Sequence, residues 1–270
     1  MLINDLDVSG VTVRYVDEGP ASSPSPPLLL LHGYLGSSLD WYDVLPLLAS
    51  HRRVIAIDHR GHGDGAKFGL ASAYTFDALL DDLVGFVDAV ALDQFHLAGH
   101  SMGGVIAMRY ALVAPERLAS LVLVDTAAAP AGRLPREILD GLIATGRTAG
   151  MDAVAELILS SLAGVSDVRR ERGRRKFGAV DVEAMAALAD ELESYPDLLP
   201  QLADLTVPTT VICGANDDLL TACRRLADVI PGAELEVVPG AGHSPFEDEP
   251  EHWVRIVESH LDRADTRLAR

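Results

Sequence analysis

The chain has 270 residues, of which 49% are hydrophobic, and a formal net charge of −18 at pH 7. This size and apolar content suit one large domain or a domain with a sizeable insertion, and the acidic balance argues against a nucleic-acid partner because phosphates would be repelled. The N-terminus lacks the basic segment of a secretory signal, and no apolar run near it approaches the roughly 20 residues that cross a bilayer. We therefore expect a cytoplasmic protein with no membrane partner. Two cysteines, Cys213 and Cys223, are too few for a disulfide framework.

The first third of the chain predicts a hairpin, two buried strands and two helices. Residues 6–18 alternate apolar and polar around a Ser-Gly pair, which indicates a hairpin at a sheet edge. The apolar runs at 28–31 and 53–58 predict buried strands, and 39–50 predicts a helix between them. The pattern of 76–92 predicts an amphipathic helix with its leucines and valines inward and its acids outward. The outward acids are Asp77, Asp81, Asp82 and Asp88.

Strands and helices go on alternating in the rest of the chain, apart from one long interval. The predicted strands are 94–99, 118–125, 208–214 and 233–240. The predicted helices are 102–116, 219–230 and a final one at about 249–262. This alternation implies βαβ crossovers and a mostly parallel sheet between two helical layers, so we predict a three-layer α/β fold.

The interval at 131–203 contains no convincing buried strand and predicts a helical insertion between two strands of the sheet. Its helices are expected at 136–146, 151–164 and 182–195. The run "RRERGRRK" at 169–176 is basic in an otherwise acidic protein. A solvated surface is the ordinary fate of such a run. The alternatives are attraction of anionic substrates and docking onto the acidic body.

Ser101 is the candidate nucleophile. It lies in "LAGHSMGG", which fits the pattern G-x-S-x-G, with a predicted strand before it and a predicted helix after it. A strained turn between strand and helix leaves no room for bulky neighbours, which explains Gly99 and Gly103. Such a turn also directs the first amides of the helix toward the serine, where they can stabilise a developing oxyanion.

A serine hydroxyl needs a base, and the base needs an orienting acid. Asp217 follows one predicted strand and His243 follows the next, so both are expected at the carboxyl edge of the sheet, where open α/β sheets bind ligands. We predict His243 as the base and Asp217 as the acid. Asp125, which follows the strand at 118–125, and Asp218 are weaker alternatives for the acid.

The segment 58–64 contains two aspartates and two histidines that could form a metal site. The sequence places no further ligand near them, and a structural turn explains them better. We therefore predict no metal and no cofactor. His32 and His100 are expected to support loops.

Five motifs follow one another in a recognisable order. They are "LLLLHGYLGSS" at 28–38, "DHRGHGDG" at 58–65, the serine motif, "GANDD" at 214–218 and "GAGHSPFEDEP" at 240–250. Together they resemble the α/β-hydrolase superfamily over nearly the whole chain. The resemblance implies a core formed by 1–130 and 204–270, and a helical cap formed by 131–203.

The resemblance also implies an oxyanion hole made by the backbone N–H groups of Tyr34 and Met102. The family often has serine after its D-x-R-G-x-G turn, where this chain has Asp64 and Gly65, a difference that leaves the catalytic assignment untouched. A serine nucleophile argues against the dehalogenases and epoxide hydrolases of the superfamily, which use a carboxylate.

The expected activity is hydrolysis of a small-molecule carboxylic ester or lactone through an acyl-enzyme. Alternatives are hydrolysis of a carbon–carbon bond in ring-cleavage products, perhydrolysis on the same scaffold, and a ligand receptor without turnover. All three candidate catalytic residues are present, which disfavours the receptor. The expected substrate contacts are Tyr34, Met102, Leu142, Ile143, Leu157 and Ile158.

Overall fold

The structure is a computed structural model that describes residues 2–20, 22–132, 135–162 and 165–269. Its centre is an eight-stranded sheet with the order β1-β2-β4-β3-β5-β6-β7-β8. The neighbouring strands from β4 to β8 pair in parallel, whereas β2 pairs antiparallel with both β1 and β4. The predicted mostly parallel α/β sheet is therefore confirmed. The strands are β1 (Ile3–Val8), β2 (Val11–Glu18), β3 (Leu28–Leu31), β4 (Val54–Ile57), β5 (Phe95–His100), β6 (Leu118–Val124), β7 (Thr209–Gly214) and β8 (Glu234–Val238).

The predicted hairpin forms the edge of the sheet through β1 and β2. Its two turn residues, Ser9 and Gly10, have φ of 52° and 86°. Two successive positive φ values suit the right-handed twist of the flanking strands, which is why such turns favour small residues. Val8 then pairs with Val11 across the turn.

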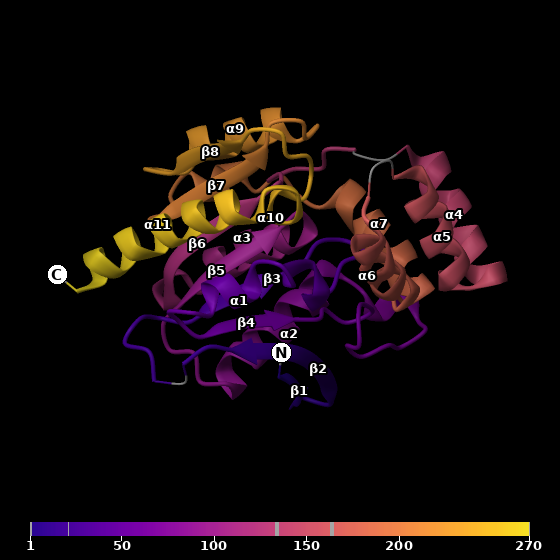
Figure 1. The fold of residues 1–270 in the computed structure, drawn as a ribbon, viewed down its shortest axis with the longest axis horizontal. Coiled ribbons are helices and arrows are strands. Elements are labelled where there is room, and N and C mark those ends of the chain that lie inside the picture. Colours follow the sequence, from indigo (N-terminus) through magenta and orange to yellow (C-terminus); the bar gives the residue numbers. More distant parts are fainter. Residues whose placement is uncertain (1, 21, 133–134, 163–164, 270) are drawn as a thin grey trace.

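Helices cover both faces of the sheet, which gives the three predicted layers (Figure 1). Alternate strand residues face opposite layers: Leu29 and Leu31 pack in one core, and Leu28 and Leu30 in the other. The first core contains residues of α2 (Phe76–Ala89), α3 (Met102–Val113) and α9 (Leu220–Val229). The second contains residues of α1 (Leu45–Leu48), α10 (Pro245–Asp248) and α11 (Pro250–Leu268).

The helix predicted at 39–50 is not continuous. The chain instead forms a 3₁₀ turn at Ser38–Trp41 and the single-turn helix α1. Pro46 lies at the start of α1 and has no N–H, so it cannot continue a helix from the preceding turn but is tolerated in a first turn. Trp41, Leu45 and Leu48 nevertheless all pack in the second core, as the apolar spacing predicted.

One acid predicted to face solvent is buried instead. Asp82 of α2 accepts hydrogen bonds of 2.5 and 2.6 Å from the guanidinium of Arg60. A bidentate arginine partner compensates the loss of hydration. Arg60 also donates to the carbonyl of Ala73, so this ion pair fixes the loop that follows β4.

Five helices lie between β6 and β7 in the described part of the chain. They are α4 (Arg136–Ala149), α5 (Met151–Ser161), α6 (Asp167–Gly178), α7 (Val182–Ser194) and α8 (Leu199–Leu202). Figure 1 shows α4 to α7 grouped at one side of the sheet. The last two residues of the helix predicted at 151–164 lie outside the described residues. Ala184 and Leu188 of α7 pack in the first core, so this group of helices shares its interior with the sheet domain.

The basic run forms most of α6 and docks onto acidic residues of the sheet domain. Arg169 lies 2.8 Å from Glu247 and 3.2 Å from Asp248, both of α10. Arg172 lies 2.7 Å from Asp43, and Lys176 pairs with the buried Asp40.

Further contacts strengthen this interface. The guanidinium of Arg172 lies 4.5 Å from the ring centre of Tyr42, within the range of a cation–π contact. Of the three explanations offered by the sequence, docking onto the acidic body is therefore the one that these ion pairs support.

None of the described helices combines the length and apolarity needed to span a membrane.

Candidate active site

Ser101 occupies a strained turn between β5 and α3. Its φ of 51° and ψ of −115° lie outside the regions that most residues adopt. A Cβ atom on Gly99 would come within 2.3 Å of the carbonyl oxygen of Gly103. A Cβ atom on Gly103 would come within 2.5 Å of the carbonyl oxygens of Leu31 and His32. The glycines are therefore required by close backbone approach, as the sequence predicted.

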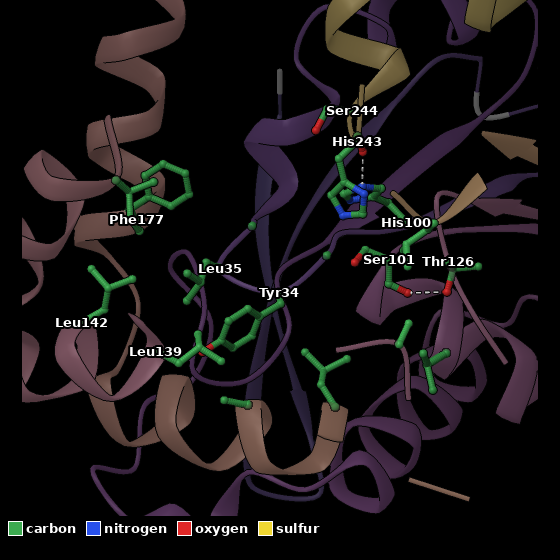
Figure 2. Close-up of a pocket in the computed structure, with 18 of the residues that line it drawn as sticks. Tyr34, Leu35, His100, Ser101, Thr126, Leu139, Leu142, Phe177, His243 and Ser244 are labelled. Atoms are coloured by element: carbon green, nitrogen blue, oxygen red, sulfur yellow. Dashed lines mark hydrogen bonds between the residues drawn. The ribbon is translucent and has the colours of Figure 1, made fainter. Parts of the chain in front are cut away.

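Hydrogen bonds hold this turn in its conformation. The N–H of Ser101 donates to the carbonyl of Val124 at 2.9 Å. The hydroxyl of Thr126 donates to the carbonyl of Ser101 at 2.7 Å, as Figure 2 shows. Val124 ends β6 and Thr126 lies two residues beyond it, so the neighbouring strand and the segment after it determine where the serine lies.

His243 lies in the loop between β8 and α10, next to Asp217. Its Nδ1 is 2.8 Å from Oδ2 of Asp217, whose side chain is completely buried. Because a carboxylate can only accept, Nδ1 carries the proton and Nε2 remains as the basic nitrogen. Ser101 and His243 line the same cavity (Figure 2). The structure thus brings the three predicted catalytic residues to one edge of the sheet.

The rival acids are placed differently. Asp218 is exposed. Asp125 is completely buried, and its Oδ1 accepts from the N–H of Gly214 at 2.9 Å and from the thiol of Cys213 at 3.3 Å. Burial raises the pKa of Asp125 to about 11. This carboxyl group is therefore neutral at pH 7, whereas an orienting acid must be ionised.

The loop Gly33–Gly36 lies against Ser101. A Cβ atom on Gly33 would come within 3.2 Å of the Cβ of Ser101. The N–H of Leu35 donates to Nε2 of His62 at 3.2 Å, and that of Gly36 donates to the carbonyl of Gly33 at 3.0 Å. The hydroxyl of Tyr34 donates to the carbonyl of Met185 in α7 at 2.6 Å, which ties this loop to the helical group.

Met102 supplies the second predicted amide. It is the first residue of α3, so its N–H has no partner inside the helix. Its side chain is fully buried in the first core and does not line the cavity. Any part that Met102 plays in the site therefore falls to its backbone.

His62 of the 58–64 segment and the neighbouring His32 act as structural acceptors. The N–H of His59 donates to Nε2 of His32 at 3.0 Å, and His62 accepts from Leu35. Burial lowers the pKa of His59 to about 3 and that of His62 to about 4, so both rings are neutral at pH 7. Asp58 accepts from the N–H of Ser38 at 2.6 Å and closes the same loop.

Within the described residues, one group of side chains has the spacing of metal ligands. Asp125, Cys213 and Asp217 offer ligand atoms that all lie within 4.8 Å of one another. Each of these side chains already takes part in a hydrogen bond, however: Oδ2 of Asp217 binds His243, and Oδ1 of Asp125 binds Cys213 and Gly214. The arrangement is best described as a hydrogen-bonded cluster behind the histidine.

A cavity of about 550 Å³ opens above Ser101 and is lined mainly by apolar side chains. This volume lies in the usual range for small-molecule sites, roughly 300–1,000 Å³. The lining side chains supplied by the helical group include Leu139, Leu142, Leu157, Ile158, Phe177 and Leu192. Lys176, the only lysine or arginine in the described lining, is paired with Asp40, which also lines the cavity.

The structure separates the predicted substrate contacts into two groups. Tyr34, Leu142, Leu157 and Ile158 line the cavity. Ile143 does not; it packs behind the cavity in a cluster with Leu35, Val154, Val180 and Met185. The sequence did not single out Leu139, although its spacing of three residues from Leu142 places both on one helix face.

The family model described as "alpha/beta hydrolase fold" matches residues 26–250. A relative from Pseudomonas putida, the dihydrolipoyllysine-residue acetyltransferase component of an acetoin cleaving system, is 31% identical over 88% of this chain. The chain spans 63% of the length of that relative.

Solved structures show the same similarity. The enol-lactonase from Burkholderia xenovorans LB400 superposes with a TM-score of 0.84 at 25% identity, over 96% of this chain and 100% of that one. A thermophilic esterase from Thermogutta terrifontis superposes with a TM-score of 0.82 at 28% identity, over 98% and 100%. The chain belongs to the α/β-hydrolase family, and the family and its neighbours support a hydrolase activity.

Proposed function

We propose that the protein is a serine hydrolase that cleaves a carboxylic ester or lactone through an acyl-enzyme. The observation that carries this proposal is the 2.8 Å bond between Asp217 and His243 beside the cavity that Ser101 lines. This arrangement supplies a nucleophile, a base and an orienting acid in the chain order typical of the fold. The similarity to an enol-lactonase and to an esterase supports the same bond type.

In the proposed mechanism, Nε2 of His243 takes the proton of Ser101 as Oγ attacks the carbonyl carbon of the substrate. The buried Asp217 carboxylate stabilises the imidazolium that forms. His243 then donates the proton to the leaving alcohol oxygen. Water enters, loses a proton to His243 and attacks the acyl-enzyme, which releases the acid and restores Ser101. In a lactone, the leaving alcohol stays attached to the acyl group.

The oxyanion of each tetrahedral intermediate is proposed to bind the backbone N–H groups of Tyr34 and Met102. Both amides belong to segments that lie against Ser101, and one of them starts a helix, where the helix dipole favours negative charge. The amides of Leu35 and Gly36 are engaged with His62 and Gly33, so they are not available for this role.

The cavity favours a neutral, apolar acyl group. The ammonium of Lys176 pairs with Asp40, and the carboxylate of Glu193 lies 3.2 Å from Arg136, so the described charges in the lining are compensated. Hydrolysis of a carbon–carbon bond in an anionic dienoate would need a cation for its carboxylate. This balance of charges therefore supports an ester over the dienoate.

We propose that residues 131–203 form the cap of this site, over a core formed by 1–130 and 204–270. The helical group supplies most of the apolar lining, and the ion pairs of α6 hold it against α10, which follows the loop of His243. Entry of the substrate would then pass between the cap and the sheet domain.

The test is hydrolysis of p-nitrophenyl esters from acetate to decanoate by the wild type and by Ser101→Ala. The proposal predicts at least about a 10³-fold lower kcat/KM for the variant. A p-nitrophenyl ester whose acyl group ends in a carboxylate serves as the matched control for charge and should react more slowly than the neutral ester of equal length. Undiminished activity in Ser101→Ala contradicts the proposal.

A further inference from the structure

A second carboxyl group lies directly behind the proposed catalytic acid. Asp125 follows β6 and is 0% exposed, with a left-handed φ of 44°. Its N–H donates to the carbonyl of Ile212 at 2.9 Å, and its Oδ1 accepts from the N–H of Gly214. These backbone contacts to β7 fix the direction of the carboxyl group. The mechanism proposed above gives Asp125 no part.

The carboxyl groups of Asp125 and Asp217 lie next to each other, each with an oxygen within 4.8 Å of the other group. Burial and then the interaction with Asp217 raise the pKa of Asp125, and in the described part of the chain no N–H or hydroxyl donor reaches Oδ2 of Asp125. Two carboxylates cannot bond without a proton between them, and two buried like charges in contact cannot both ionise. One of the pair must therefore carry a proton.

The surroundings decide which group keeps the proton. Asp217 faces the imidazole of His243, whose positive charge in the reaction favours an ionised partner. Among the described residues, Asp125 faces the thiol of Cys213, the N–H of Gly214 and Asp217 itself. The hydrogen bond to Cys223 and burial raise the pKa of the Cys213 thiol, so it brings no charge to the cluster. These contacts favour a neutral Asp125 and an ionised Asp217.

We propose that Asp125 is a positioning residue: a protonated carboxylic acid that donates its hydrogen to the Asp217 carboxylate and so holds that carboxylate toward His243. The proposal rests on the proposed function, because it assigns Asp217 as the catalytic acid. Asp125 touches neither substrate nor the reacting atoms; it acts through Asp217. The pair then carries one negative charge, which is what the imidazolium requires.

Two substitutions separate the parts of this role. Asp125→Asn keeps an oxygen for Gly214 and supplies an N–H donor to Asp217, so kcat and the pH at which activity falls on the acid side should match the wild type. Asp125→Leu removes the donor, so kcat should fall about 10- to 100-fold with KM nearly unchanged. Asp218→Asn changes an exposed neighbour and serves as the control that leaves activity unchanged.

An infrared measurement tests the proton without any substrate. The wild type at pH 7 should show the carbonyl band of a buried protonated carboxylic acid, and Asp125→Asn should lack it. If no ester is hydrolysed, the proposed function fails, yet the band still decides the state of Asp125. If Asp125→Leu does not fold, the asparagine variant and the band are sufficient.

The proposal is overturned by any of three results. One is the absence of the band from the wild type. Another is an Asp125→Asn variant that is folded but at least as impaired as Asp125→Leu. The third is an acid limb of activity that moves to lower pH in Asp125→Asn, because that shift shows that a negative charge was lost.

Discussion

The ring of His100 donates from Nε2 to the backbone carbonyl of His243 at 2.7 Å. The residue immediately before the candidate nucleophile thus holds the loop of the candidate base, and the two rings contact each other at a tilt of 55° with centres 4.7 Å apart. The middle residue of "GHS" therefore sets the distance between two segments that lie more than 140 positions apart in the chain.

This contact predicts a loss of activity in His100→Phe. Phenylalanine keeps an aromatic ring against Phe246, whose centre lies 5.0 Å from that of His100, but it removes the donor. Loss of one hydrogen bond of about 0.5–1.5 kcal/mol should lower kcat/KM for an ester by about 2- to 12-fold. His100→Gln, which retains a donor, should recover part of the loss. Equal losses in both variants would contradict the role of the donor.

The glycines of the serine turn predict a contrast in stability. Gly103→Ala places a Cβ atom 2.5 Å from two backbone carbonyl oxygens, and overpacking of this kind costs about 1–3 kcal/mol. Gly141→Ala, in α4, meets no atom within 4 Å, so it should raise the free energy of unfolding by about 0.5–1 kcal/mol. Urea unfolding of the two variants measures the difference. A stable Gly103→Ala protein would contradict the close approach.

The docking of α6 predicts that Lys176→Met strongly lowers the free energy of unfolding. Asp40 would remain buried without its partner, and breaking a buried ion pair costs about 3–5 kcal/mol. Adding Asp40→Asn to Lys176→Met should restore much of this free energy, since no unpaired charge then remains. Arg175→Met removes an exposed charge of the same helix and serves as the control. Its free energy of unfolding should differ from that of the wild type by no more than about 0.5 kcal/mol. A double variant no more stable than Lys176→Met would contradict this account.

Buried histidines predict that the protein loses stability in mild acid. Burial lowers the pKa of His260 to about 4 from an ordinary 6.5. Between these values the unfolded chain takes up a proton that the folded ring does not, so stability falls as pH decreases, by up to about 1.4 kcal/mol per pH unit for each such histidine.

Urea unfolding at pH 7, 6 and 5 measures this dependence. His260 bonds Thr210 at the end of the sheet away from the cavity, so His260→Gln should reduce the slope without removing a proposed catalytic group. Replacement of the exposed His51 by Gln should leave the slope as it is. An unchanged slope in His260→Gln would show that this ring is not the source.

Local patterns were sufficient to predict most of the fold and the placement of the candidate site. The apolar run at 28–31 and the Ser9–Gly10 turn depend on side-chain burial and backbone preference, both of which are visible in a short stretch. The turn of Ser101 carries a motif whose glycines meet specific backbone atoms.

The features that the sequence missed or left open depend on contacts between distant segments. The burial of Asp82 depends on Arg60, and the docking of α6 depends on Asp40 and Asp43. The proximity of Asp125 and Asp217 joins the ends of two strands that are separated by the whole helical insertion. Periodicity also left Leu139 and Ile143 equivalent, and only the packing of α4 placed the first in the cavity and the second behind it.

The most direct test of the central claim is covalent labelling with a fluorophosphonate, followed by intact mass and peptide mapping. We predict one adduct per chain, located on Ser101, no adduct in Ser101→Ala, and wild-type labelling in Ser244→Ala, which changes another serine that lines the cavity. His243→Gln should label at least about 10³-fold more slowly, because the serine then lacks its base. An unlabelled wild type, or labelling of Ser101→Ala at the wild-type rate, would contradict the account.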